Sequence, residues 1–370
     1  MNVTVRGRRR PFRTVSFDAA RNEVVLIDQR CLPHEFKLVR TRDFRETAEA
    51  IRDMTVRGAG AIGATAAFGL AQGARAFCKG GLAKFEAHVE RVFERLKGAR
   101  PTAVDPVNAM LEVRARLGAG TTVAGRQARA LDAAMAFADE DVSHCEAIGR
   151  HGAKLVRAGA HVLTHCNAGW LAFVDIGSAT APLYAAQELG RKFHVFCAET
   201  RPRSQGATLT AWELSQQGIS HEIIADNAAG HLMQQGEVDL VLVGSDRTLG
   251  RTGEVANKIG TYTKAVLAHR HGIPFYVCIP LSTIDWNLRR GRDIPIEERS
   301  GDEVLGAWGT VQGPKMSARA YLRVANPGSR ARNPGFDVTP PELITGIVTP
   351  AGIFRPSELW RHRAQLGGPR

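Results

Sequence analysis

The chain has 370 residues, of which 44% are hydrophobic and 23% charged. This composition is typical of a globular protein long enough for two domains, and it excludes disordered, collagen-like and coiled-coil chains. No apolar run is long enough for a transmembrane helix, and none follows the first basic residues as in a secretory signal. Six scattered cysteines without a C-x-x-C pair predict neither a disulfide framework nor structural zinc. We therefore expect a cytoplasmic protein without a membrane partner.

The net charge of +12 comes from 49 Lys and Arg against 37 Asp and Glu, and most of the basic residues are arginines spread along the chain. The one dense cluster lies between Arg6 and Arg13. We interpret residues 1–11 as a solvated basic tail, with a very short transit peptide as the alternative. A dispersed arginine excess predicts no nucleic-acid partner, and the positive charge favours an anionic small molecule as substrate.

Residues 12–145 are predicted to form a small, mainly helical N-terminal domain. Short strands are expected at 12–17 and 24–28, and helical periodicity then recurs between loops marked by Gly and Pro. The expected helices cover 47–54, 61–77, 85–96, 107–117 and about 127–157.

Residues 146–370 are predicted to form a Rossmann-like catalytic domain, because short apolar runs alternate with helical patterns from residue 160 onward. Such alternation is typical of right-handed βαβ units and a parallel sheet, so the fold class is α/β. The expected strands cover 161–164, 194–197, 222–225, 240–243 and 275–279. The expected helices cover 181–189, 209–216, 228–234 and 259–269.

Polar clusters follow several of these predicted strands. In an open α/β sheet the carboxyl ends of the strands line the crevice where ligands bind, so these clusters predict a functional site there. They are His165-Cys166-Asn167, Glu199-Thr200-Arg201, Asp226-Asn227, Gly244-Ser245-Asp246 and Ser282-Thr283.

Residues 58–63 spell G-x-G-x-x-G, but the context of a dinucleotide-binding fingerprint is missing. That motif follows a strand and has an acidic residue about 20 positions on, whereas residues 51–57 look helical and no acid lies near Cys78. We interpret Arg57 and the glycines as an anion cradle at a helix start near Ala61. A tight turn between two helices is the alternative.

Cys166 and Asp246 are the candidates for chemistry. A helix start directly after Cys166 would suit its thiol to acid/base or nucleophilic work, although a free Cys is more often a small buried hydrophobe. Asp246 follows a very apolar strand, where a dry crevice would let it hold a proton; a helix N-cap is the alternative. His161 and His165 lie about 13 Å apart on a strand, so no metal site is predicted.

Four segments carry a resemblance to methylthioribose-1-phosphate isomerases, a family that belongs with the α, β and δ regulatory subunits of the translation-initiation nucleotide-exchange factor. The resemblance covers roughly residues 12–350. It implies the two-domain α/β fold, a homodimer, a sugar phosphate as small-molecule substrate, and no cofactor or metal. The segments are Thr164–Gly169, Glu199–Ala207, Leu209–Leu214 and Ala256–Tyr262, supported by Arg57–Ala59, Arg100–Val104 and Ile296–Arg299.

The same resemblance implies a role for individual residues. Asp246 corresponds to the family's proton donor, and Cys166 to the cysteine that stabilises the transition state. The substrate and phosphate contacts that it implies are Arg57, Gly58, Ala59, Arg100, Gln205, Asn257 and Lys258. Asn257 and Lys258 are expected to open the helix at 259–269.

Three positions depart from the family pattern. Gly60 stands where the family usually has Pro, which predicts a looser cradle, and residues 251–254 replace the usual loop after Asp246. Trp170 and the residues up to 175 are similar to a branch that includes 5-deoxyribose-1-phosphate isomerases. They leave open whether the substrate carries a methylthio group or a hydrogen at carbon 5.

The resemblance implies conversion of 5-methylthioribose 1-phosphate to 5-methylthioribulose 1-phosphate, an aldose–ketose isomerisation of methionine salvage. Alternatives within the enzymes are isomerases of 5-deoxyribose 1-phosphate and ribose 1,5-bisphosphate. The alternative from another class is a noncatalytic regulatory subunit, which predicts a degraded catalytic pair.

Overall fold

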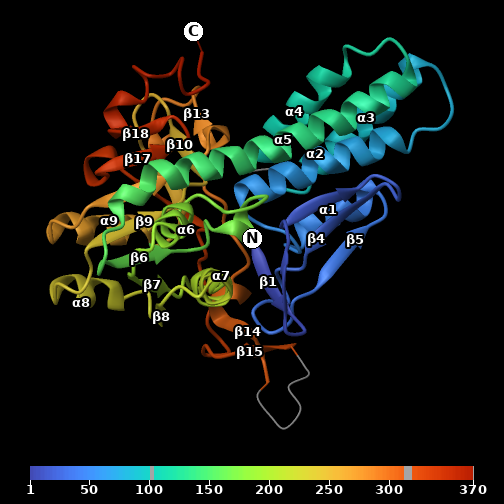
Figure 1. The fold of residues 1–370 in the computed structure, drawn as a ribbon. Helices are drawn as coiled ribbons and strands as arrows, with labels where there is room; N and C mark the ends of the chain where they lie inside the picture. Colours follow the sequence, from blue (N-terminus) through green and yellow to red (C-terminus); the bar gives the residue numbers. More distant parts are fainter. Residues whose placement is uncertain (101–103, 312–318, 370) are drawn as a thin grey trace.

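The computed structural model describes residues 1–100, 104–311 and 319–369 (Figure 1). The predicted α/β fold is confirmed: a helical N-terminal part lies beside a part built on a seven-stranded sheet. The helices of the N-terminal part are α1 (Phe44–Arg52), α2 (Ala59–Arg75), α3 (Leu82–Lys97), α4 (Asp105–Leu117) and α5 (Val123–Gly152).

The first eleven residues are a β-hairpin, so the prediction of a solvated tail is wrong. Strand β1 (Asn2–Val5) pairs antiparallel with β2 (Arg8–Pro11). Val3 is buried in an apolar cluster with Ile27 and Trp170, whereas β2 leaves its arginines exposed. The basic residues suggest a tail, but the valines of β1 bury enough apolar surface to hold the hairpin on the body of the protein.

A second small sheet follows, made of β3 (Val15–Asp18), β4 (Glu23–Ile27) and β5 (Leu38–Thr41). It packs against α2, which is buried along nearly its whole length. Small residues make this burial feasible: side chains at Gly69 or Gly73 would collide with Leu96 and Val92 of α3. The glycines of the 58–73 segment thus serve close helix packing as well as the start of α2.

Helix α5 joins the two parts of the molecule. Its N-terminal half packs against α2 and α4, and its C-terminal half against α6 (Ala181–Glu188) and strand β17. It runs unbroken across the molecule (Figure 1). The boundary predicted between residues 145 and 146 therefore falls inside a continuous helix.

The large sheet has the strand order β18-β17-β12-β9-β6-β7-β8, and its pairs are parallel except β17 with β18. The five predicted strands are confirmed within one or two residues, and β17 and β18 are additions. The bounds are β6 (His161–His165), β7 (His194–Ala198), β8 (His221–Ile224), β9 (Leu240–Val243), β12 (Phe275–Cys278), β17 (Gly346–Thr349) and β18 (Gly352–Phe354).

Both faces of this sheet are buried, which explains its near-continuous apolar strands. Leu240 and Leu242 of β9 face the layer of α5, α6 and α7 (Ala211–Gln217), whereas Val241 and Val243 face α8 (Ala228–Gln234) and α9 (Thr261–Arg270). The carboxyl ends of β6, β7 and β9 are thereby held between two helical layers.

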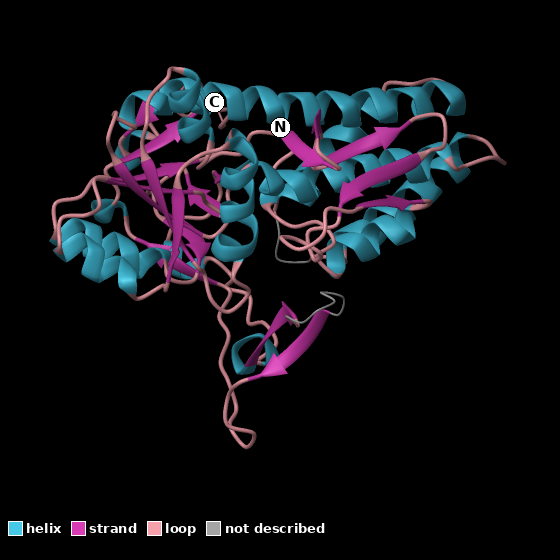
Figure 2. Ribbon diagram, turned by 60° about the horizontal axis from the view of Figure 1, so that its bottom comes forward, coloured by secondary structure: helices cyan, strands magenta, loops and turns pink. Residues whose placement is uncertain are grey.

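A four-stranded sheet that the sequence did not predict lies beside these carboxyl ends. Its strands, in the order β13-β10-β11-β16, are Ile284–Asp285, Arg247–Leu249, Val255–Lys258 and Phe336–Thr339. Asn257 and Lys258 end strand β11 and do not open a helix, which corrects the prediction. A short helix α10 (Asp302–Leu305) leads to a hairpin of β14 (Gly306–Thr310) and β15 (Arg319–Arg323), which projects from the body (Figure 2).

Candidate functional site

All nine residues singled out from the sequence line one cavity of about 80 Å³ between the two parts of the molecule. The N-terminal part supplies four of them from the start of α2 and the loop before α4, and the loops after β6, β7 and β9 together with β11 supply the rest. They are Arg57, Gly58, Ala59, Arg100, Cys166, Gln205, Asp246, Asn257 and Lys258.

The cavity is strongly cationic. Among its described lining residues are four positively charged side chains, Arg57, Arg100, Lys258 and Arg299, and one carboxyl, Asp246. Burial lowers the pKa values of Arg57, Arg100 and Lys258, the last to about 8, and Arg299 acts in the same direction on Arg100 and Lys258. Gathering like charges in a poorly solvated space is costly unless an anion neutralises them, so the cavity suits a phosphate.

Cys166 follows the last residue of β6 and has a left-handed backbone with φ of 65°. Two buried hydroxyls hold this uncommon conformation: the Cys166 N–H donates to Thr200 Oγ1 (2.8 Å), and Thr210 Oγ1 donates to the Cys166 carbonyl (2.7 Å). A non-glycine residue held at positive φ often marks a functional site. The residues beyond Cys166 form only a 3-10 turn at Trp170–Ala172, so the α-helix start expected there is absent.

Asp246 lies in the loop between β9 and β10, where its N–H donates to the Ala256 carbonyl (3.0 Å). It precedes a strand and caps no helix, which excludes the N-cap interpretation. Burial raises the pKa of its carboxyl, although the charges of Arg100 and Lys258 oppose the shift. The predicted rise is thus confirmed, and a raised pKa suits Asp246 to donate a proton near neutral pH.

The residues of the predicted cradle, Gly58 and Ala59, stand at the N-terminus of α2 and line the cavity. Gly58 has φ of 93°, and a Cβ there would collide with the backbone of Ala172, so only glycine fits. The first N–H groups of a helix have no acceptor within it, so the start of α2 beside the cavity is suited to an anion. The element directly before the glycines is helix α1 and not a strand, in agreement with the rejected dinucleotide motif.

Gly60 packs closely within the first turn of α2, and the looser cradle stays a prediction. A Cβ at this position would lie 2.5 Å from Phe173 Cδ1 and 2.5 Å from Asp141 Oδ1. Gly60 therefore leaves space that Phe173, itself a cavity-lining residue, occupies.

Two lining side chains keep polar atoms without a hydrogen-bond partner among the described residues: Arg100 Nε and Gln205 Oε1. Both atoms are buried, and such atoms usually find a partner in a folded protein or its ligand. Lys258 Nζ donates to the Gly335 carbonyl (2.8 Å), and Asn257 Nδ2 donates to Thr261 Oγ1 (3.0 Å).

Nine further residues line the cavity beyond the nine that were assigned a role in catalysis or binding from the sequence. Arg299 and Asn167 lie inside the family motifs and Ser245 directly precedes Asp246, so these three carried a signal. Phe336 carried none, because it reaches the cavity through the pairing of β16 with β11. The nine are Met54, Ile62, Asn167, Ala168, Ala172, Phe173, Ser245, Arg299 and Phe336.

Of the other two departures from the family pattern, the segment 170–175 reaches the cavity lining through Ala172 and Phe173, whereas residues 251–254 do not line the cavity. Trp170 is fully buried and stacks on Trp212, with 5.6 Å between ring centroids. In the loop between β10 and β11, Arg251 lies over the ring of Trp360, and Glu254 accepts a hydrogen bond from the Gly291 N–H (2.7 Å). Trp170 and the loop 251–254 therefore act through packing, whereas Ala172 and Phe173 can contact a ligand in the cavity.

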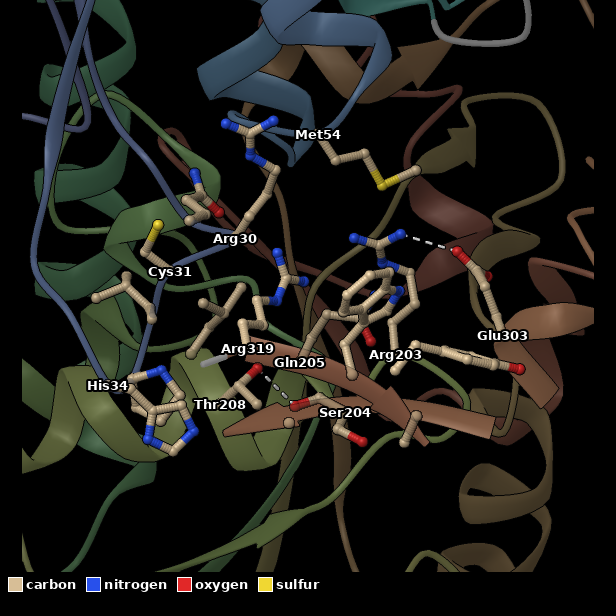
Figure 3. Close-up of a pocket in the computed structure, with 18 of the residues that line it drawn as sticks. Arg30, Cys31, His34, Met54, Arg203, Ser204, Gln205, Thr208, Glu303 and Arg319 are labelled. Carbon is tan, nitrogen blue, oxygen red and sulfur yellow. Dashed lines mark hydrogen bonds and ion pairs between the residues drawn. The ribbon is translucent and has the colours of Figure 1, made fainter. Parts of the chain in front are cut away.

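An outer chamber of about 860 Å³ adjoins this cavity and shares Met54, Arg57 and Gln205 with it. Figure 3 shows Arg30, Arg203 and Arg319 around this chamber. The hairpin β14–β15 forms one of its walls.

Within the described ranges, no three His, Cys, Asp or Glu side chains gather in a way that could hold a metal ion. His165 instead lies within hydrogen-bond distance of the Ile259 carbonyl through Nε2 (2.8 Å), and burial lowers its pKa to about 3. No helix in the part of the chain that the structure describes is long and apolar enough to cross a membrane.

Comparison with known proteins shows the broad class to which the chain belongs. The model of the Initiation factor 2 subunit family matches residues 55–356. A solved structure named translation initiation factor eIF-2B subunit delta, from A. fulgidus, is 37% identical with a TM-score of 0.80, covering 94% of this chain and 97% of that one.

Within that class, the similar curated proteins share one name. The methylthioribose-1-phosphate isomerase of Methylorubrum extorquens is 49% identical, covering 94% of this chain and 95% of its own. That of Cereibacter sphaeroides is 50% identical, covering 93% of each. The crystal structure of 5-methylthioribose 1-phosphate isomerase from Pyrococcus horikoshii matches with a TM-score of 0.84 and 41% identity, covering 97% of this chain and 96% of that one. The chain belongs to the methylthioribose-1-phosphate isomerase family.

Proposed function

We propose that this protein is an aldose–ketose isomerase of methionine salvage that converts 5-methylthioribose 1-phosphate to 5-methylthioribulose 1-phosphate. The observation that carries the proposal is the convergence of Asp246, Cys166 and four cations on one cavity. The names of the similar curated proteins support the same substrate. A noncatalytic subunit would have no need of Asp246 and Cys166 in one cavity, so an enzyme is the better explanation.

The substrate sets the chemistry that the site has to perform. Its phosphate sits on the anomeric carbon, so the sugar cannot open to a free aldehyde while the phosphate remains. Asp246 donates a proton to the ring oxygen, and the bond between that oxygen and carbon 1 breaks. Hydrogen then moves from carbon 2 to carbon 1, and the hydroxyl on carbon 2 loses its proton. The product is a 2-ketone with a primary phosphate, and no redox partner is needed.

Two routes for the hydrogen are open. Cys166 is placed to act as a base that takes the carbon 2 proton through a phosphoenolate, or to polarise the reacting carbons during a hydride shift. Substrate deuterated at carbon 2 separates the two routes. Complete retention of deuterium on carbon 1 in water supports the hydride shift, whereas exchange with solvent requires the enolate.

The cations account for binding of the phosphate. Arg57, Arg100 and Lys258, with the N–H groups at the start of α2, supply charge-assisted donors for its oxygens. The free donor on Arg100 and the free acceptor on Gln205 are suited to the phosphate and a sugar hydroxyl, respectively. The outer chamber provides the path by which the substrate reaches them.

Purified protein offered the 1-phosphates of 5-methylthioribose, 5-deoxyribose and ribose tests the function. We expect the largest kcat/KM with the methylthio sugar. Preference for the deoxy sugar would reassign the substrate within the same reaction, and no turnover of any of the three would refute the isomerase. The homodimer and the cytoplasmic location remain predictions, and light scattering coupled to size exclusion tests the first.

A further inference from the structure

Glu213 is a fully buried carboxylate in α7 that contacts the loop following Cys166. Four donors saturate its two oxygens. Oε1 accepts from Asn167 Nδ2 (2.9 Å) and the Leu171 N–H (2.8 Å), and Oε2 accepts from the Trp170 N–H (3.0 Å) and Tyr184 Oη (3.1 Å). Three of the four donors belong to the loop that follows Cys166 and ends in the 3-10 turn: Asn167 precedes the turn, and Trp170 and Leu171 lie in it.

The loop fits this carboxylate closely. A Cβ at Gly169 would overlap the Glu213 carboxylate, so the residue in contact with it has to be glycine. A buried carboxylate with four donors is expensive to disturb, because removing its charge leaves buried N–H groups without an acceptor. Glu213 therefore determines the path of the loop that carries Asn167.

Asn167 connects Glu213 to the cavity. Its Nδ2 group donates to Glu213 and to Thr210 Oγ1 (3.2 Å), which leaves Oδ1 pointing the other way. Arg57 donates to that oxygen through Nη1 and to the Asn167 main-chain carbonyl through Nη2 (2.6 Å). A guanidinium group has donors only, so it requires the oxygen and not the amino group of the amide.

The carboxylate thus sets the orientation of the Asn167 amide. With an acceptor at Glu213, the amino group of Asn167 is held there and its oxygen faces Arg57. Without that acceptor the amide is free to turn and to present N–H groups to the guanidinium, which repels them. Two of the five N–H donors of Arg57 are used by Asn167, so the other three are left for a ligand in the cavity.

We propose that Glu213 and Asn167 are positioning residues that hold the guanidinium of Arg57 in the orientation that binds the substrate's phosphate. The chain of contacts Glu213–Asn167–Arg57 is called the relay below. It rests on the proposed function for the identity of the phosphate ligand. Glu213 does not itself line the cavity. Its hydrogen-bond partners are the lining residue Asn167, the main chain of Trp170 and Leu171, and Tyr184.

Glu213→Gln tests the relay with the smallest change of shape. We expect KM for 5-methylthioribose 1-phosphate to rise about tenfold, the loss of roughly one charge-assisted hydrogen bond, while kcat stays within about threefold. Asn167→Ala leaves the hydrogen bonds from the Trp170 and Leu171 N–H groups to Glu213 in place. It therefore tests the relay while the loop stays attached to Glu213. It is expected to raise KM by about five- to tenfold.

Tyr184→Phe is the matched control, because it removes the one Glu213 donor that lies outside the loop. We expect a lower melting temperature and a KM within about twofold of wild type. An equal rise of KM in Tyr184→Phe and Glu213→Gln would mean that Glu213 is merely structural, and would overturn the proposal.

A double-mutant cycle with Arg57→Ala provides the sharpest measurement. If Glu213 acts through Arg57, Glu213→Gln changes KM by less than about twofold in the Arg57→Ala background, whereas independent effects multiply and refute the relay. Calorimetric titration with inorganic phosphate repeats the cycle without turnover. It therefore tests the relay even where the wild type isomerises none of the three sugars, a result that would refute only the proposed function.

Discussion

The cavity and the outer chamber are both lined by arginines, but these arginines differ in how many of them have a carboxylate partner. In the outer chamber, Arg30 forms ion pairs with Asp28 and Asp53, and Arg203 pairs with Glu303 (2.8 Å). In the cavity, Arg57 donates to a neutral amide and the Nε of Arg100 has no partner among the described residues. Arg100 and Arg299 of the cavity also form ion pairs with Glu297 (3.7 Å and 3.3 Å), but Arg57 and Lys258 have no carboxylate partner among the described residues. These two cations of the cavity thus indicate an anion site better than the larger volume of the chamber does.

The largest test of this contrast is Asp246→Asn. The amide keeps the shape of the carboxyl but cannot donate a proton to the ring oxygen and recover it, so kcat should fall by about 10²- to 10⁴-fold. Steady-state kinetics with 5-methylthioribose 1-phosphate measures the change. Full activity in this variant would exclude Asp246 as the proton donor.

A matched pair of cations compares the two spaces directly. Lys258→Met removes a charge from the cavity and should lower kcat/KM about 100-fold, the loss of roughly two charge-assisted hydrogen bonds. Arg319→Met removes a charge from the outer chamber, where Arg319 lies over the ring of Trp308, and should change kcat/KM by less than about threefold. Similar losses of kcat/KM in both variants would contradict the distinction between the cavity and the outer chamber.

The pH dependence of anion binding sharpens the contrast further. Burial and the neighbouring Arg299 lower the pKa of Lys258 to about 8, so its ammonium charge is present below this pH and lost above it. Inorganic phosphate stays a dianion from pH 8 to 10, so a fall in its affinity over that range reports the protein. We expect its Kd to rise about tenfold over this range. In Lys258→Arg, which keeps its charge, the rise should disappear, and its persistence would point to another group.

The smallest expected effect concerns the carboxyl behind the cavity. Burial raises the pKa of Asp141 to about 7 from an ordinary 3.8, and its Oδ2 accepts from the Val174 N–H (2.7 Å). Because the folded state holds this proton more tightly, the group's stabilising contribution is complete below about pH 4 and is lost as pH rises through 7. Asp141→Asn imitates the protonated form, so it should raise the unfolding free energy by about 1–3 kcal/mol at pH 8 and change it little at pH 4. Denaturant unfolding at the two pH values checks this, and an equal effect at both would contradict the shift.

The sequence predicted the candidate site better than its surroundings. Cys166 and Asp246 each follow an apolar strand of the parallel sheet, and such strands bring their carboxyl ends to one edge. The second sheet was not predictable in the same way, because β11 and β16 pair Asn257 with Asp337 and nothing local indicates that pairing. For this reason Lys258 was expected at a helix start and Phe336 was missed.

The N-terminal hairpin shows a different limit. Arg8, Arg9 and Arg10 dominate the composition of the first eleven residues, so the charge pattern indicates a tail. The pairing of β1 with β2 and the burial of Val3 depend on an apolar cluster formed by distant residues. Local charge could not reveal that cluster.

Helix α5 has a mechanical consequence for the cavity between the two parts. Its 30 residues form a strut about 45 Å long that is packed at one end on α2 and α4 and at the other on α6 and β17. Swinging one part away from the other would bend this strut and break its backbone hydrogen bonds. The helix therefore fixes the width of the cavity. Any motion that admits a sugar phosphate is then expected in elements held by loops, such as the β14–β15 hairpin.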